Sequence, residues 1–128
     1  MDVLTHEMID HELCGRPLSL DKNYSKVEMK TTQRMTVDVT GLVHGGFIFG
    51  LADYSAMIAV NHPNVVLGAA EVKFLKPVKS GDVLIAEAWV GEKEGKRHSV
   101  SVIIKEGDTE VFEGMFICFV LNKHVLIN

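Results

Sequence analysis

The sequence has few of the residues that mark secreted, metal-bound or membrane-spanning proteins. Cysteine occurs only at Cys14 and Cys118, without CxxC spacing, and we expect two reduced thiols rather than a disulfide. The residues before Cys14 include acids and histidines and form no apolar stretch, so no secretory signal is predicted and a cytoplasmic location is expected. The longest apolar run is too short and too interrupted by glycine and polar residues to cross a bilayer.

Positive charge is also scarce. Thirteen lysines and arginines face seventeen aspartates and glutamates, which gives a formal net charge of −4. This balance argues against nucleic-acid binding through a basic surface. The sequence contains no Walker loop and no Rossmann glycine fingerprint, and its histidines lack the spacing of metal ligands. We therefore expect neither a metal nor a separate cofactor.

From Gly45 to Val60, Asp53 is the only formally charged side chain. A helix that is apolar on nearly every face belongs in the interior of a protein. The stretch therefore predicts a buried central helix around which the rest of the chain folds. An isolated carboxylate is costly to bury, so Asp53 needs a partner or a chemical role.

Alternating apolar and polar residues predict strands on both sides of this helix. Residues 24–32 alternate before it, with a continuation expected over residues 34–39. Short turns join most of the later strands, so the pairing should be antiparallel. The fold class is therefore α+β, with a long central helix wrapped by a curved antiparallel sheet of about five strands. The strands expected after the helix are 65–74, 82–90, 96–105 and 110–121.

The chain length of 128 residues predicts one domain over residues 1–128. Residues 1–17 are expected to form an N-terminal extension. The apolar positions within residues 2–12 predict a short amphipathic helix there. The sequence Gly15-Arg16-Pro17 should end that helix.

Two glycines open the predicted central helix. Gly45 and Gly46 allow close backbone approach, and the first N–H groups of a helix have no intrahelical partner. These groups lie at the positive end of the helix dipole, where they can polarise a carbonyl or hold an oxyanion. A tight turn beneath packed strands explains the two glycines equally well.

The spacing between Gly46 and Asp53 predicts a dimer. Seven residues place both on one helix face but about 10 Å apart along the axis. One carbonyl cannot be within hydrogen-bonding distance of both. If both act on one substrate, they come from two copies of the chain with antiparallel helices and two sites at the interface.

Two residues just before the helix have alternative interpretations. Asp38 is either a functional acid or a loop residue that caps the turn at Thr40-Gly41. His44 is expected to orient the loop by hydrogen-bonding the backbone through a ring nitrogen. Metal ligation is the less favoured alternative for His44.

Two segments resemble the hot-dog-fold acyl-CoA thioesterases of the phenylacetate-degradation (PaaI) type. Over about residues 24–121, the resemblance implies a long helix wrapped by an antiparallel sheet, in a homodimer or a dimer of dimers. It also implies an acyl-CoA ligand, with coenzyme A as part of the substrate. The segments are Gly41-x-x-His44-Gly45-Gly46 followed by Leu51-Ala52-Asp53 and Asn61, and Val72-x-Phe74-x-x-Pro77-Val78-x-x-Gly81-Asp82.

The resemblance gives roles to individual residues. Asp53 matches the helix carboxylate that acts as general base or nucleophile, and Gly46 matches the glycine whose N–H polarises the thioester carbonyl. Asn61 matches an asparagine at the helix end with a structural role. Asp38 stands where the PaaI type commonly has Asn, but Asp38-x-x-Gly41-x-Val43 resembles the 4-hydroxybenzoyl-CoA thioesterase loop, in which that Asp is the catalytic acid. The sequence leaves open which acid carries the chemistry.

The expected substrate contacts follow from the same comparison. His44 and Gly45 would lie at the bound thioester. The acyl group would contact Phe47, Met57 and Ile58. The phosphates of coenzyme A would contact basic residues, for which solvated sheet edges are the alternative interpretation: Lys76, Lys79, Lys96 and Arg97.

The sequence therefore predicts an acyl-CoA thioesterase. The alternative is a non-catalytic acyl-CoA-binding or sensing protein that acts through a partner. Residues 70–74 with Pro77-Val78 also resemble FapR-like acyl-CoA-sensing regulators. Asp53 favours the enzyme, because non-hydrolytic relatives typically lose the helix acid. A dehydratase is a third alternative, but its usual combination of histidine and helix carboxylate is not evident.

Overall fold

The nearly uncharged stretch of residues 45–60 forms the central helix of the protein. A computed structural model describes residues 1–127, in which helix α2 spans Gly45–Val60, the range that the sequence predicts. Its C-terminal cap is Asn61, in the left-handed conformation (φ 54°, ψ 51°) that commonly ends helices. Nine of its sixteen residues are buried. No helix in the described residues is long and apolar enough to cross a membrane.

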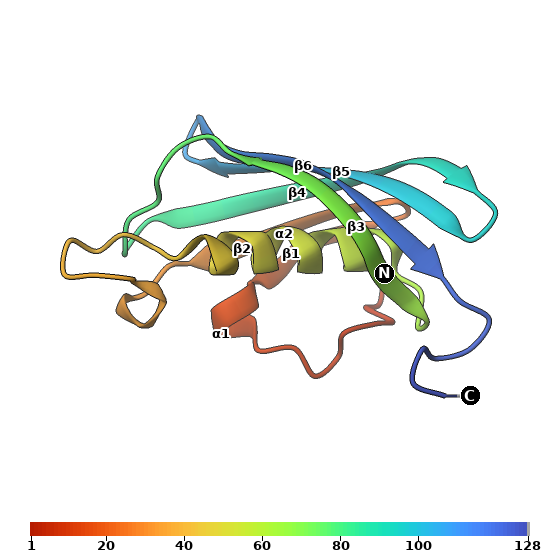
Figure 1. The fold of residues 1–128 in the computed structure, drawn as a ribbon. Helices are drawn as coiled ribbons and strands as arrows, with labels where there is room; N and C mark the ends of the chain where they lie inside the picture. Colours follow the sequence, from red (N-terminus) through yellow and green to blue (C-terminus); the bar gives the residue numbers. More distant parts are fainter. Residues whose placement is uncertain (128) are drawn as a thin grey trace.

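The sheet curves over α2, so the predicted hot-dog arrangement is confirmed (Figure 1). It has six strands in the order β1-β2-β4-β5-β6-β3, and all neighbours are antiparallel. Strands β1 and β3 are its two edges. The strands are β1 (Arg16–Asp21), β2 (Tyr24–Lys30), β3 (Val65–Phe74), β4 (Val83–Glu94), β5 (Arg97–Glu106) and β6 (Thr109–Val120).

The core lies between α2 and the concave face of the sheet. Alternate residues of β2, β4 and β5 face the helix, as the period-two pattern predicts. The aromatic rings of Phe112 and Phe116 extend this core along β6. Buried strand residues include Val27, Met29, Leu84, Ala86, Val100, Val102 and Ile104.

The sequence did not predict strand β1. Its residues are mostly exposed, and its pairing with β2 is interrupted by a bulge between Pro17 and Ser19. Proline is compatible with an edge strand, where its missing N–H can lie on the unpaired side. Because its residues are mostly exposed and include a proline, the sequence indicated the end of a helix here and not a strand.

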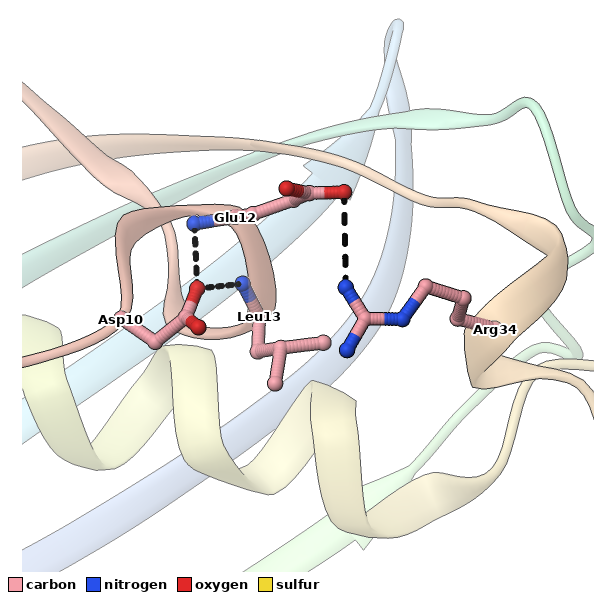
Figure 2. Close-up of polar contacts among 4 residues, drawn as sticks. All are labelled: Asp10, Glu12, Leu13 and Arg34. Carbon is pink, nitrogen blue, oxygen red and sulfur yellow. Dashed lines mark hydrogen bonds and ion pairs between the residues drawn. The ribbon is translucent and has the colours of Figure 1, made fainter.

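The predicted helix over residues 2–12 is wrong. Helix α1 comprises only His11–Cys14, and residues 2–10 form no helix. The Asp10 carboxylate begins α1 by accepting hydrogen bonds from the backbone N–H groups of Glu12 (2.9 Å) and Leu13 (3.0 Å) (Figure 2). Of the apolar residues in this irregular segment, Val3 and Ile9 pack against the core, whereas Leu4 and Met8 are exposed.

The predicted continuation of a strand over residues 34–39 is also wrong. A short 3₁₀ helix, η1, spans Gln33–Met35, and one isolated bridge joins Thr36 to Val43. Met35 is fully buried, and its carbonyl accepts a hydrogen bond from the His44 N–H at 2.8 Å. The chain therefore turns back toward the start of α2.

The N-terminal segment runs along the side of α2 that faces away from the sheet (Figure 1). Asn61 holds it there: its Oδ1 accepts from the Leu4 N–H and its Nδ2 donates to the Asp2 carbonyl, both at 2.8 Å. The structural role expected of Asn61 is thus confirmed. The His6 and His11 rings lie beside Tyr54, at centroid distances of 6.4 and 6.1 Å.

Candidate functional site

Asp53 has the environment of a functional acid. Its Oδ1 is buried and has no hydrogen-bond partner within residues 1–127. Burial raises the pKa of its carboxyl to about 6. Its charge also contributes, after burial, to a raised pKa of the thiols of Cys14 on α1 and Cys118 on β6. Both thiols are free, as expected.

Asp53 is not part of an ion pair. The one ion pair among the described residues joins Glu12 and Arg34, 3.7 Å apart and largely solvent-exposed (Figure 2). Burial, and not a neighbouring carboxylate, accounts for the raised pKa of Asp53. The Asp53 carboxylate is held in place by the apolar helix rather than by compensating charge.

Asp38 lies in an exposed loop and caps a turn. Its Oδ1 accepts hydrogen bonds from the Thr40 N–H at 2.9 Å and the Thr40 hydroxyl at 2.6 Å. These bonds, the hydroxyl first, hold the pKa of Asp38 below its usual range. This is the turn-capping alternative from the sequence. A carboxylate with a lowered pKa is a weaker base than Asp53.

The start of α2 presents backbone donors, but one is already used. His44 is the N-cap, and its Nδ1 accepts the Gly46 N–H at 2.7 Å. The Phe47 N–H donates to the His44 carbonyl at 3.1 Å. The Gly45 N–H has no partner in the described part of the chain. The donor predicted for a thioester carbonyl is therefore occupied by His44, while its neighbour is free.

An apolar groove of about 290 Å³ lies beside this helix start. Its lining includes Gly45 and Ile48 from α2 and the segment 74–78 that connects β3 to β4. Lys76 is the only charged residue among residues 1–127 that line it. Sequence reasoning missed the groove, although the apolar residues around Pro77 were a usable signal. The structure thus brings Gly45 and Lys76 together.

A second groove of about 430 Å³ contains Lys79. It is also lined by Thr40, Leu42 and Pro77, so Lys79 lies near the same end of α2 as Lys76. Arg97 begins β5, whereas Glu106 at the other end of that strand lines this groove. One chain therefore does not bring Arg97 to Lys79, and Lys96, the residue before Arg97, is equally remote.

The residues predicted to contact the acyl group are only partly accessible. Phe47 is half-buried, and the His44 ring packs edge-on against it, with centroids 6.2 Å apart. Met57 and Ile58 are fully buried in the core. Both side chains project from α2 into the hydrophobic core, and neither lines a groove at the helix start.

The sequence matches known proteins over most of its length. The pattern of the thioesterase superfamily matches residues 40–113. A methylthioribose-1-phosphate isomerase from Aquifex aeolicus is 53% identical over 116 residues, which are 91% of this chain and 25% of that protein. A transcription factor FapR from Caldanaerobacter subterraneus subsp. tengcongensis is 34% identical over 120 residues, 94% of this chain and 56% of that protein. The chain thus spans from a quarter to just over half the length of these curated relatives.

Solved structures share the whole fold. An uncharacterized protein from Pyrococcus horikoshii superimposes with a TM-score of 0.98 and 50% identity, covering 99% of this chain and 98% of that one. The PaaI protein from the phenylacetic acid degradation operon of E. coli has a TM-score of 0.78 at 24% identity, covering 88% and 83%. The PaaI structure supports the fold but is too distant to assign an activity.

Proposed function

This chain belongs to the thioesterase superfamily, and on that premise we propose that it hydrolyses the thioester of an acyl-CoA with Asp53 as general base. The observation that supports the proposal most directly is the buried Oδ1 of Asp53, which lacks a hydrogen-bond partner in the described residues. An unpartnered carboxylate with its pKa raised to about 6 is suited to accept a proton from water near neutral pH.

At the acyl carbon, the proposed reaction makes one bond and breaks one. Asp53 takes a proton from water as the water oxygen bonds to the thioester carbon. The negative charge that develops on the carbonyl oxygen is stabilised by a backbone N–H at the start of α2. The carbon–sulfur bond then breaks, and the proton passes to the leaving thiolate. The products are a free carboxylic acid and coenzyme A with a free thiol.

A second copy of the chain would complete the site. Within one chain, the Gly46 N–H and Asp53 are about 10 Å apart along α2. Strand β3 is an edge of the sheet, and Ala70 and Phe74 on its concave side are exposed, Phe74 to 52%. Such an uncovered edge strand can pair with another chain. We therefore assign the dimer contact to β3, so that the donor of one copy approaches Asp53 of the other.

Two lysines beside the grooves are suited to bind the phosphates of coenzyme A. Lys76 and Lys79 are exposed, lie near the helix start and line the two grooves there. The phosphates of coenzyme A are anionic and would remain near solvent. Lys76 and Lys79 are therefore the basic residues proposed to contact them.

The direct test is free-thiol release from a panel of short, long and aromatic acyl-CoAs. Asp53→Asn keeps the volume of the side chain but removes the base, and we expect turnover to fall about 100-fold or more. Asp38→Asn is the matched control, because it removes an acid from the turn in front of the same helix, and turnover should stay within about twofold. Loss of turnover in Asp38→Asn alone would transfer the catalytic role to Asp38.

Binding without hydrolysis is the second candidate function. Two observations favour it: the transcription-factor relatives match 94% of this chain, and His44 occupies the Gly46 N–H. In this case the acyl-CoA panel would bind, as measured by calorimetry, without releasing thiol. Asp53→Asn would then leave the binding affinity nearly unchanged.

A further inference from the structure

The backbone donor that remains free at the start of α2 is flanked by an aromatic ring. The Gly45 N–H has no hydrogen-bond partner among residues 1–127. A Cβ atom added at Gly45 would lie 3.3 Å from Cε1 of Phe74 and 3.7 Å from its Cζ. These are contact distances, so the absence of a side chain at Gly45 lets the ring rest directly against the helix start. A group that binds the Gly45 N–H therefore lies beside Phe74.

The Phe74 ring is supported on one side and open on the other. Phe74 is the last residue of β3 and pairs with Phe112 of β6. The two rings pack edge to face, with centroids 5.2 Å apart and an interplanar angle of 79°. Phe112 is fully buried and gives the neighbouring ring a rigid support, whereas Phe74 itself is 52% exposed. The ring therefore presents an apolar surface of fixed orientation next to a free donor.

This surface continues into the apolar groove of about 290 Å³. Gly45 and Phe74 both line the groove, and so does Lys76. A thioester carbonyl that accepts from the Gly45 N–H holds its carbon about 4 Å from the nitrogen. With the phosphates of coenzyme A at Lys76, as proposed above, the chain between the sulfur and the phosphates runs along the groove. That chain then passes the exposed side of the ring.

We propose that Phe74 packs against the arm of coenzyme A next to the sulfur and so holds the thioester carbonyl at the Gly45 N–H. This inference rests on the ligand of the proposed function, coenzyme A, and not on its hydrolysis. Phe74 supplies neither a proton nor a charge, so it is a positioning residue. The acyl group extends from the other side of the carbonyl carbon, away from the ring. The ring therefore does not select among acyl groups.

Two substitutions of Phe74 and one matched control test this contact. Phe74→Ala removes the ring, and Phe74→Leu keeps an apolar side chain on Phe112 without the flat surface, which protects the test if alanine weakens the fold. Met115→Ala is the control. Met115 is a 44% exposed apolar residue of β6 that also pairs with β3, but it lies on the opposite face from the buried Phe116. Light scattering and chemical denaturation measure the mass and the stability of each variant.

The readouts are the dissociation constant of coenzyme A, from calorimetry, and kcat/KM for linear, branched and aromatic acyl-CoAs, from thiol release. We expect Phe74→Ala to weaken coenzyme A binding and lower kcat/KM by about 5- to 10-fold, the effect of uncovering roughly 50 Å² of apolar surface. Phe74→Leu should lose less than the alanine variant. The ratio of kcat/KM between any two acyl-CoAs should stay within about twofold of the wild-type ratio. Met115→Ala should change neither readout.

The outcomes separate this inference from the proposed function. Unchanged coenzyme A binding in Phe74→Ala overturns the ring contact, whatever happens to turnover. A changed ratio among the acyl-CoAs would place the ring on the acyl side, which also overturns it. Loss of binding together with dissociation into single chains would show that Phe74 holds the two copies together instead.

A failure of the proposed function gives a different result. If the wild type binds coenzyme A but releases no thiol from any acyl-CoA, the proposed hydrolysis fails, while the change in binding still decides the role of Phe74. If the wild type binds no coenzyme A, both proposals fail together.

Discussion

Asp53 and Asp38 lie in opposite electrostatic environments, although only one helix start separates them in sequence. Burial raises the pKa of Asp53 to about 6, whereas hydrogen bonds from Thr40 lower the pKa of Asp38. The ionised form of Asp53 therefore destabilises the folded state, whereas the ionised form of Asp38 stabilises it. Costs of this kind are common at functional sites, where a residue is kept for its chemistry rather than for stability.

The pKa of Asp53 predicts a pH profile. If Asp53 is the base, it acts only when deprotonated, so kcat/KM should fall tenfold per pH unit below about 6. Steady-state thiol release between pH 4.5 and 8 measures this profile. The Asp38→Asn variant should keep the same midpoint. A midpoint near 4 in the wild type would indicate an acid that is not buried, and would contradict the assignment to Asp53.

The same shift predicts an effect on stability. Between its unfolded pKa near 4 and its folded pKa of about 6, Asp53 binds a proton more tightly in the folded state. Stability should therefore fall as the pH rises through this window, and the whole penalty is present above pH 6. Two pKa units correspond to about 3 kcal/mol.

Urea unfolding of the wild type and Asp53→Asn at pH 4 and pH 7.5 measures this penalty. The advantage of the asparagine variant in unfolding free energy should be about 2 kcal/mol larger at pH 7.5 than at pH 4, because part of the penalty is already present at the unfolded pKa. An advantage that does not change with pH would mean that the Asp53 carboxyl is solvated in the folded protein.

At the scale of elements, α1 reaches the core through its C-terminal cap. Gly15 has φ 104°, and a Cβ atom there would lie 2.7 Å from Val27 Cγ1 and 2.8 Å from Leu51 Cδ1. The absence of a side chain therefore lets α1 pack directly onto β2 and α2. The docking of the N-terminal segment depends on this contact and on the Asn61 hydrogen bonds.

Substitution of Gly15 separates crowding from backbone strain. Gly15→Ala should lower the free energy of unfolding by about 3 kcal/mol, because a methyl group enters a filled space at a positive φ. Gly81 has nearly the same φ (98°) but no atom within 4 Å of its added Cβ, so Gly81→Ala should cost about 1 kcal/mol. Equal losses in chemical denaturation would show that crowding at Gly15 is relieved by repacking.

Periodicity predicted the elements that bury one continuous face. The nearly uncharged stretch predicted both ends of α2 correctly, and alternation located strands β2 to β6, because burial imposes those patterns. Strand β1 buries little, so it left no such pattern. The loop around Asp38 and the groove at 74–78 depend on contacts between distant segments. One sequence cannot show which donor His44 occupies, since that depends on a single side-chain rotamer.

At the scale of the whole molecule, the two-copy site predicts complementation between inactive variants. Asp53→Ala lacks the base, and Gly46→Pro lacks the N–H donor in the first helical turn. The proline ring must also displace the His44 side chain, whose Nδ1 lies 2.7 Å from a Cβ atom placed at Gly46. In a shared-site dimer, a mixed pair contains one intact site and one doubly damaged site. Mixing the two inactive variants in equal amounts should restore about a quarter of the wild-type activity after exchange of subunits.

Thiol release after co-refolding of the two variants measures this recovery, and each variant refolded alone is the control. Light scattering should give twice the 14.2 kDa mass of one chain for both. If the mixture stays inactive while both variants remain dimeric, each site is built from a single chain, and the shared arrangement is wrong.

The two edges of the sheet differ in their capacity to propagate. Strand β1 carries Pro17 and a bulge, which interrupt the regular row of donors and acceptors that an incoming strand requires. Strand β3 presents an uncovered row over Ala69–Phe74. A unit with two receptive edges can add copies without limit and grow into a fibre. With one receptive edge, the pairing of two β3 strands leaves only the interrupted β1 edges unpaired, so growth through the sheet ends at two chains.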